Sequence, residues 1–188
     1  MALITQSGPE TIKIGEPGPA FADLPGADGA SYGLDSFADA TLLVLNFTCN
    51  HCPYAKAYEE RFNQLAKEFG PQGVAFLAVN SNDVDSYPDD NMENMVQRTK
   101  ERGFVFPYVR DDDQSVAKAY GAVCTPHLFV LDQDRKLAYE GRIDDNWQQP
   151  DAVTSPDLRR ALEALLAGEA VPAAQTNPMG CSIKWKSA

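Results

Sequence analysis

The sequence predicts an α/β fold in which helices flank a mixed central β-sheet. The first observation is that short apolar runs alternate with segments whose apolar residues recur at helical spacing. The second is that helical segments separate the early strands, which favours parallel pairing, whereas a short polar turn joins the last two, which favours antiparallel pairing. Helices are therefore expected on both faces of the sheet.

The strands are predicted from the short apolar runs at residues 42–47, 74–79, 104–109, 128–131 and 137–140. Before them, residues 8–40 are rich in Gly, Pro, Asp and Ala, which indicates an extended lead-in containing a β-hairpin. We expect a single domain at residues 1–168, with an N-terminal extension at 1–40 and a C-terminal tail at 169–188.

Helices are predicted at residues 52–69, 89–102 and 113–120, and after Ser155-Pro156, which is expected to cap the last helix. Apolar residues share one face of the first and last helices, namely Tyr58, Phe62, Leu65 and Phe69, then Leu158, Leu162 and Leu165. Gly70-Pro71 and Gly168 are expected to end these two helices.

The composition excludes several classes of function. The chain has 188 residues and a formal net charge of -11, which argues against nucleic acid or an anionic membrane as a partner, because both need a basic face. Neither a secretory signal nor an apolar run of about 20 residues is recognisable. We therefore expect a soluble, cytoplasmic protein, and in that compartment a C-x-x-C pair indicates redox catalysis or metal binding.

Cys49 and Cys52 occur in the stretch NFTCNHCPY, between a predicted buried strand and the start of a predicted helix. The free N–H groups and dipole of a helix N-terminus stabilise a thiolate, and cysteines so placed can have pKa values of roughly 3.5–7.5. We expect Cys49 at the accessible edge as the attacking thiol. Cys52 is expected in the first turn of the helix, where it can resolve a mixed disulfide.

His51 lies between the two cysteines, where an imidazole can stabilise the thiolate by a hydrogen bond or by its charge. The alternative is that His51 faces solvent. About 75 residues further on, Thr125-Pro126 precedes a predicted buried strand. Proline is tolerated in sheets only at strand starts, edges and bulges, and a cis peptide bond fits this position.

These motifs resemble the thioredoxin superfamily, and within it the redoxin or peroxiredoxin-like (AhpC/TSA-like) branch. The resemblance rests on Cys49-Asn-His-Cys52-Pro53-Tyr54, on Val123-Cys124-Thr125-Pro126 and on the strand–hairpin–helix order that follows. It covers roughly residues 12–167. The tail sequence Gly180-Cys181-Ser182-Ile183-Lys184-Trp185 is similar to the GCxIKW-type tail of small bacterial proteins with a CNHCPY-type site.

The resemblance implies a thioredoxin fold with Cys49 as attacking thiolate and Cys52 as resolving thiol. It implies a cis Thr125–Pro126 bond whose backbone binds the substrate chain. The implied substrate is a disulfide-containing protein or a small thiol compound, with peroxide as a further possibility. The implied partner is a recycling thiol reductant, and no dissociable cofactor is expected.

A peroxiredoxin-like antioxidant enzyme is the first alternative. In that family the peroxide-reducing cysteine aligns with Cys52, and a proline commonly follows it, as Pro53 does here. However, Cys49 stands where peroxiredoxins have threonine, and Thr125-Pro126 lies in the region of their peroxide-polarising arginine. Arg110 or Arg142 would substitute only if folding brings it near. These departures favour thiol–disulfide exchange over peroxide reduction by Cys52 or Cys49.

A metal site is the second alternative, because Cys49, Cys52, Cys124 and His127 have the spacing of a four-ligand zinc or copper site. Without metal, Cys124 is expected to be a buried inert thiol or a modulator of the pair. Cys181 is expected either to be a third redox thiol that reaches Cys49 or Cys52, or to pack with Ile183 and Trp185. Residues 80–83 are expected at the site-bearing edge of the sheet, or as simple turn residues.

Overall fold

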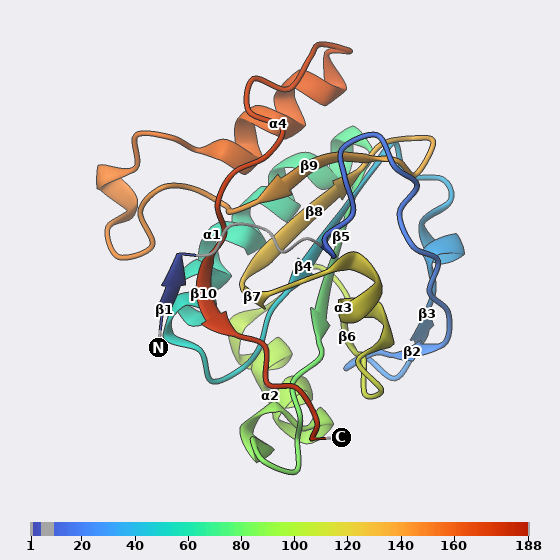
Figure 1. Ribbon diagram of the computed structural model, residues 1–188, viewed down its shortest axis with the longest axis vertical. Coiled ribbons are helices and arrows are strands. Elements are labelled where there is room, and N and C mark those ends of the chain that lie inside the picture. The colour runs from blue at the N-terminus through green and yellow to red at the C-terminus, as the bar shows by residue number, and fades with distance from the viewer. Residues whose placement is uncertain (1, 5–9, 188) are drawn as a thin grey trace.

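The computed structural model describes residues 2–4 and 10–187, with helices on both faces of a twisted central sheet (Figure 1). The order of the five strands is β6-β5-β4-β8-β9. Their bounds are Tyr108–Arg110, Val74–Asn80, Leu42–Phe47, His127–Leu131 and Leu137–Gly141. The pairs β4–β5 and β5–β6 are parallel, whereas β4–β8 and β8–β9 are antiparallel. The predicted mixed sheet is therefore confirmed.

The helices are α1 (Pro53–Phe69), α2 (Met92–Arg102), α3 (Ser115–Tyr120) and α4 (Asp157–Leu166). Helix α2 starts later than predicted because Pro88–Asp90 forms a separate 3-10 turn and Asn91 caps α2 by accepting a hydrogen bond from the backbone of Asn94. The expected cap at Ser155-Pro156 is wrong in detail. Pro156 is the N-cap of α4 without a side-chain bond, and the Ser155 hydroxyl donates to Asp157 instead.

The remaining 3-10 turns are η1 (Leu34–Phe37), η2 (Gly70–Gln72) and η4 (Pro150–Ala152), beside η3 at Pro88–Asp90. Within the described part of the chain, none of the helices combines the length and apolar character needed to cross a lipid bilayer.

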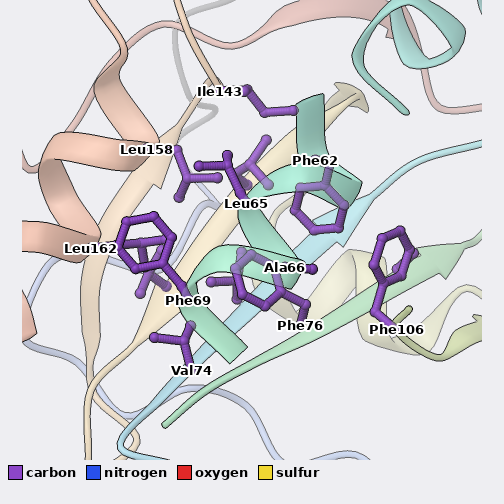
Figure 2. Close-up of a cluster of buried hydrophobic side chains, with 14 of the residues drawn as sticks. Phe62, Leu65, Ala66, Phe69, Val74, Phe76, Phe106, Ile143, Leu158 and Leu162 are labelled. Atoms are coloured by element: carbon purple, nitrogen blue, oxygen red, sulfur yellow. The ribbon is translucent and has the colours of Figure 1, made fainter. Parts of the chain in front are cut away.

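The two faces of the sheet carry separate apolar cores, which explains why β4 is apolar at nearly every position. Leu42 and Val44 face the core that α1 and α4 cover, shown in Figure 2 with Phe62, Leu65, Phe69, Leu158 and Leu162. Leu43, Leu45 and Phe47 face the other core, under α3 and the N-terminal extension. Both cores hold the end of β4 rigidly, and the cysteine loop begins there.

The N-terminal extension contains the predicted hairpin in a minimal form, with β2 (Leu24–Pro25) antiparallel to β3 (Ser31–Tyr32). The tail contains a strand that the sequence did not indicate, β10 (Met179–Ser182). This strand lies between β1 (Ala2–Ile4) and β7 (Cys124–Thr125) and is antiparallel to both. Strands from the N-terminal and C-terminal parts of the chain, β1 and β10, therefore pair beside the cis-proline loop (Figure 1).

Candidate redox site

The two cysteines of the C-x-x-C motif lie in the connection between β4 and α1. Cys52 is the N-cap of α1 and Pro53 its first helical residue, so the helix begins directly after the pair. The sequence analysis had placed Cys52 inside the first turn of the helix and Cys49 at the accessible edge before it. The observed position places the free N–H groups and positive dipole end of the helix closest to Cys52.

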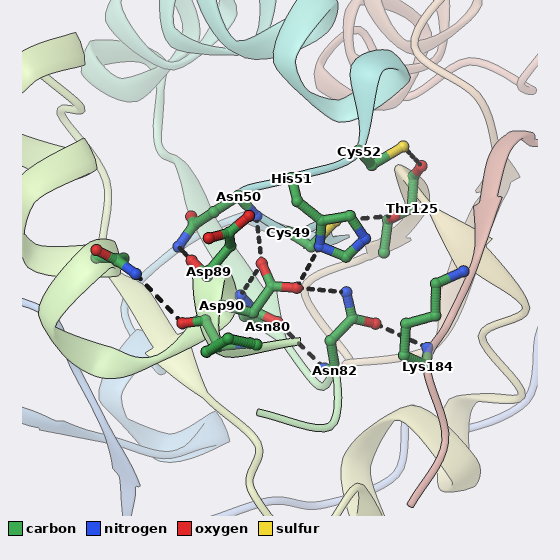
Figure 3. A network of polar contacts seen from close by, with 12 residues as sticks. Cys49, Asn50, His51, Cys52, Asn80, Asn82, Asp89, Asp90, Thr125 and Lys184 are labelled. Atoms are coloured by element: carbon green, nitrogen blue, oxygen red, sulfur yellow. Dashed lines mark hydrogen bonds and ion pairs between the residues drawn. The ribbon is translucent and has the colours of Figure 1, made fainter. Parts of the chain in front are cut away.

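Thr125 contacts both thiols from across the sheet. The Cys49 Sγ lies 3.3 Å from the Thr125 hydroxyl, and the Cys52 thiol donates to the Thr125 carbonyl oxygen at 3.2 Å. The Thr125–Pro126 peptide bond is cis, as predicted. Figure 3 shows Thr125 pointing toward the two cysteines from the loop opposite. Through Thr125, strand β7 holds the cis-proline loop against both thiols.

Cys181 is the third thiol at this site. It packs, partly exposed, against a small cluster of Cys49, Cys52 and Ala55. In the pairing of β10 with β7 its partner is Thr125, the residue that contacts both Cys49 and Cys52. Cys124 is fully buried, and its thiol points to the carbonyl oxygen of Pro126 at 3.5 Å.

The surroundings of the three thiols shift their pKa values in opposite directions. The bond from the Cys49 thiol, followed by bonds from the Cys181 thiol and from the backbone N–H groups of Ala55 and Cys181, lowers the pKa of Cys52 to about 5. The same bond to Cys52, together with burial, raises the pKa of Cys49 above its ordinary value. Burial and the bond to Cys52 raise the pKa of Cys181 to about 11. Ionisation is therefore most favoured at Cys52, which gives up its hydrogen bond to the Thr125 carbonyl oxygen when it becomes a thiolate.

The solvent exposure of the cysteine pair differs from what the sequence predicted. The side chain of Cys49 is 2% exposed and that of Cys52 is 0% exposed, so the prediction of an accessible edge position for Cys49 is wrong. The cause is tertiary. The C-terminal strand β10 and the loop of Thr125 cover the pair, and both come from distant parts of the chain.

His51 is paired with an aspartate that the sequence analysis did not single out. Its Nδ1 lies 2.6 Å from Asp90 Oδ2, and its ring stacks on Tyr87 at 5.2 Å between centroids. The Asp90 bond is the main reason that the pKa of His51 is raised, and the negative charge of Cys52 acts in the same direction. His51 is thus held by a buried carboxylate. A negative charge on Cys52 favours the charged form of His51, the form that was predicted to stabilise the thiolate.

Asp90 is the centre of a buried polar network, drawn in Figure 3. Its carboxylate is fully buried and accepts from the Asn50 backbone at 2.6 Å, from the Asn82 amide at 2.8 Å and from the Asn80 amide at 3.3 Å. Burial would raise the pKa of Asp90, but the bonds from His51, Asn82 and Asn50 outweigh it and keep the pKa below its ordinary value. The asparagines after β5 therefore serve the site by fixing Asp90.

Asp90 was missed because it lies in η3, 39 positions from His51 in the chain. The run Pro88-Asp-Asp-Asn reads as turn chemistry, and no periodic pattern distinguishes a structural from a functional aspartate there. The available signal was indirect. The asparagine-rich segment after β5 was expected at the carboxyl edge of the sheet, where polar groups of α/β proteins converge.

The predicted four-ligand metal site does not form. His127 is fully buried, its Nδ1 accepts from the Val123 backbone at 3.3 Å, and its Nε2 is paired with Glu140. Both ring nitrogens are therefore occupied, and no lone pair remains for a metal. Within the described residues, a different trio has ligand atoms within 4.8 Å of one another, namely Cys49, His51 and Asp90. In that trio His51 and Asp90 already bind each other.

The two arginines considered for peroxide activation have other partners. The Arg110 guanidinium donates to the backbone carbonyls of Asn80 and Asn82. Arg142 forms an ion pair with Asp157 at 2.7 Å. Both guanidinium groups therefore stabilise neighbouring loops.

A small cavity of about 20 Å³ adjoins Cys49 and is lined by residues of β4, α1 and the loop before β6. Its volume suits one water-sized molecule. Asn46 is one of its lining residues, and the side-chain carbonyl oxygen of Asn46 is buried and has no hydrogen-bond partner within the described residues.

The model of the AhpC/TSA family matches residues 14–140, about two thirds of the chain. The chain belongs to the AhpC/TSA family. A curated relative, the thiol-disulfide oxidoreductase ResA of Geobacillus thermodenitrificans, is 29% identical over 126 residues, which cover 67% of each protein. Family and relatives together make the chain an oxidoreductase of the thioredoxin-like redoxin branch.

Solved structures agree with this fold. The crystal structure of an uncharacterized conserved protein from Geobacillus kaustophilus is similar, with 42% identity, 94% coverage of both chains and a TM-score of 0.88. A hypothetical protein from Sinorhizobium meliloti 1021 is 38% identical, with 95% and 97% coverage and a TM-score of 0.89. The peroxidoxin BcpB of Mycobacterium tuberculosis, at 23% identity, 83% and 97% coverage and a TM-score of 0.61, shares the fold alone.

Proposed function

We propose that this protein is a thiol–disulfide oxidoreductase whose redox centre is the pair Cys49 and Cys52. The observation that carries the proposal is that Cys49 and Cys52 pack in one cluster at the N-terminus of α1, where Thr125 contacts both sulfurs. This contact brings both sulfurs within reach of the same reaction. A helix N-terminus favours the thiolate that such a reaction needs.

The geometry supports Cys52 as the nucleophile and Cys49 as the resolving thiol, the reverse of the order that the resemblance implied. The Cys52 thiolate attacks one sulfur of a substrate disulfide, and the other substrate sulfur leaves as a thiolate and takes a proton. Cys49 then loses its proton and attacks the Cys52 sulfur. The substrate is released as a dithiol, and the protein holds the Cys49–Cys52 disulfide.

The neighbouring groups have supporting roles in this proposal. Pairing with Asp90 raises the pKa of His51 and so favours its imidazolium form, and that positive charge stabilises the Cys52 thiolate. The Thr125–Pro126 backbone orients the substrate segment. A thiol reductant then restores the Cys49 and Cys52 thiols, and the substrate class is a disulfide-containing protein or small disulfide.

Peroxide reduction is the second candidate, and one observation favours it. Hydrogen peroxide can donate to the unpaired oxygen of Asn46 in the cavity beside Cys49. Against it, the pKa of Cys49 is raised, because Cys49 donates to Cys52 and is buried. A protonated thiol is a poor nucleophile, so thiol–disulfide exchange remains the better-supported function.

The test compares two oxidants of the fully reduced, metal-free protein, hydrogen peroxide and the disulfides of insulin, with free cysteine as the reference for both. We expect insulin to be reduced far faster by the protein than by free cysteine, and peroxide to react no faster than with free cysteine. Cys52→Ser should abolish insulin reduction. Cys49→Ser combined with Cys181→Ser should trap a mixed disulfide, because no neighbouring thiol remains to resolve it, and Cys124→Ser is the matched control. Peroxide consumption orders of magnitude above the reference would identify a peroxidase instead.

A further inference from the structure

The C-terminal strand β10 brings a third cysteine to the redox pair from the far end of the chain. In the register between β10 and β7, Cys181 is the partner of Thr125, and Ser182 is the partner of Cys124. Thr125 accepts the hydrogen bond of Cys52 at 3.2 Å. The β7 strand thus aligns Cys181 with Cys52, and Cys181 packs against the cluster formed by Cys49, Cys52 and Ala55.

The close approach of β10 depends on the residue before the cysteine. A Cβ atom at Gly180 would lie 2.1 Å from the carbonyl oxygen of Thr125 and 2.5 Å from its carbonyl carbon. Both are backbone atoms that cannot rotate away. Gly180 is therefore required for Cys181 to reach Cys52.

The segment after the strand is anchored firmly. Ile183 is 3% exposed and belongs to the apolar core on the α3 face. The Lys184 backbone donates to the Asn82 side chain at 2.8 Å, and its carbonyl accepts from the Asp83 backbone at 2.8 Å and from the Gln114 amide at 2.9 Å. Cys181 is thus held beside Cys52 in the absence of any substrate.

The three thiols differ in their access to solvent. Cys49 and Cys52 are buried at 2% and 0% exposure, whereas Cys181 is partly exposed. Thiol–disulfide exchange needs the attacking sulfur to reach a disulfide sulfur directly, so access limits the rate. A folded protein partner reaches Cys181 more readily than either cysteine of the pair.

We propose that Cys181 is a third redox thiol that transfers the disulfide of the buried pair to the protein surface, an inference that rests on the proposed function. In the oxidised protein, the Cys181 thiolate attacks the Cys52 sulfur of the Cys49–Cys52 disulfide. A Cys52–Cys181 bond forms, the Cys49–Cys52 bond breaks, and Cys49 leaves as a thiolate and takes up the proton that Cys181 gave up. This exchange involves no net oxidation.

The surface disulfide then reacts with an external dithiol. One thiolate of the dithiol attacks the partly exposed Cys181 sulfur, and Cys52 leaves as the thiolate that its hydrogen bonds stabilise. The second thiol of the external partner attacks the mixed disulfide and displaces Cys181. The partner ends as a disulfide, and the protein regains its thiols. Run in reverse, the same steps reduce a disulfide on a protein partner.

The test maps disulfides after one equivalent of diamide, with remaining thiols blocked in acid. Trypsin places Cys49 and Cys52 in peptide 14–56, Cys124 in 119–135 and Cys181 in 161–184. We expect the Cys49→Ser protein to yield the cross-linked pair of peptides 14–56 and 161–184, because only Cys52 and Cys181 remain in contact. Cys52→Ser should yield little of it. Adding Gly180→Ala to the Cys49→Ser protein removes no further thiol, yet it should reduce the yield of the cross-linked peptides.

The kinetic arm compares Cys181→Ser with its neighbour Ser182→Ala. We expect Cys181→Ser to slow insulin reduction by about tenfold. The rate at which this variant reacts with the small disulfide dithiodipyridine should change by less than about twofold. Absence of the cross-link in Cys49→Ser, or insulin reduction by Cys181→Ser at the wild-type rate, would overturn the inference. A protein that forms the cross-link yet does not reduce insulin supports the exchange and refutes the proposed function, so the two failures are distinguishable.

Discussion

The thiolate of Cys52 gives the sharpest prediction about the chemistry of the site. The neighbouring thiol of Cys49 lowers its pKa most, followed by the thiol of Cys181 and the backbone N–H groups of Ala55 and Cys181, and together they bring the pKa to about 5. The change Cys181→Ala removes the thiol donor and leaves the backbone donor in place. It therefore isolates one hydrogen bond to a charged sulfur.

The magnitude follows from the worth of one such bond. A hydrogen bond to a charged group contributes about 1.5–3 kcal/mol, and one pKa unit corresponds to about 1.4 kcal/mol. Cys181→Ala should therefore raise the pKa of Cys52 by about one to two units. The midpoint moves from about 5 toward the neutral range, so the variant keeps a smaller fraction of thiolate in mildly acidic buffer.

The assay is the pH dependence of the ultraviolet absorbance of the thiolate in a protein without Cys49 and Cys124, kept reduced with a phosphine. The parent protein carries serine at position 49, which keeps a hydroxyl donor beside Cys52. The parent and its Cys181→Ala derivative therefore differ only in the thiol of Cys181. Ser182→Ala is the matched control, because its hydroxyl contacts Lys184 and not the thiols. An unchanged midpoint in Cys181→Ala, or a parent that titrates near 9, would refute this account of the site.

Three further outcomes are expected. Asp90→Asn removes a fully buried charge that His51 needs, so the free energy of unfolding should fall by about 3–5 kcal/mol and the pKa of His51, followed by NMR, should fall as well. The exposed neighbour Asp89→Asn should leave both unchanged. Gly180→Ala should cost about 1–3 kcal/mol in urea unfolding and expose Cys181 to faster alkylation, whereas Gly70→Ala, with open space at its Cβ, should not. Finally, the lowered pKa of Cys52 means that its contribution to the stability of the reduced protein is complete above pH 9 and is lost as the pH falls toward about 5. The stability difference between wild type and Cys52→Ser should grow across that range by at most about 1.4 kcal/mol per pH unit, and a flat difference would contradict the assigned thiolate.

Local patterns determined most of the fold. The apolar run at 42–47 was placed correctly because its residues are buried on both faces, and the helix carrying Phe62 and Phe69 because its apolar face repeats with the helical period. Thr125-Pro126 was recognised because proline is confined to few places in a sheet. Short elements were placed less well, such as the strand expected at 104–109, which is Tyr108–Arg110. There the apolar residues at 104 and 106 pack as loop residues against the core.

The sequence by itself determined the mixed sheet, the position of the cysteine pair between strand and helix, and the cis-proline loop, because each depends on neighbouring residues. Only the tertiary structure decided which thiol ionises and which one is reachable. Asp90, Thr125 and Cys181 come to the pair from segments some 40 to 130 positions away, and local periodicity carries no information about such contacts. The charge and access of a thiol are set by the groups around it in space, so the roles of Cys49, Cys52 and Cys181 emerge only when strands β7 and β10 close over the helix N-terminus.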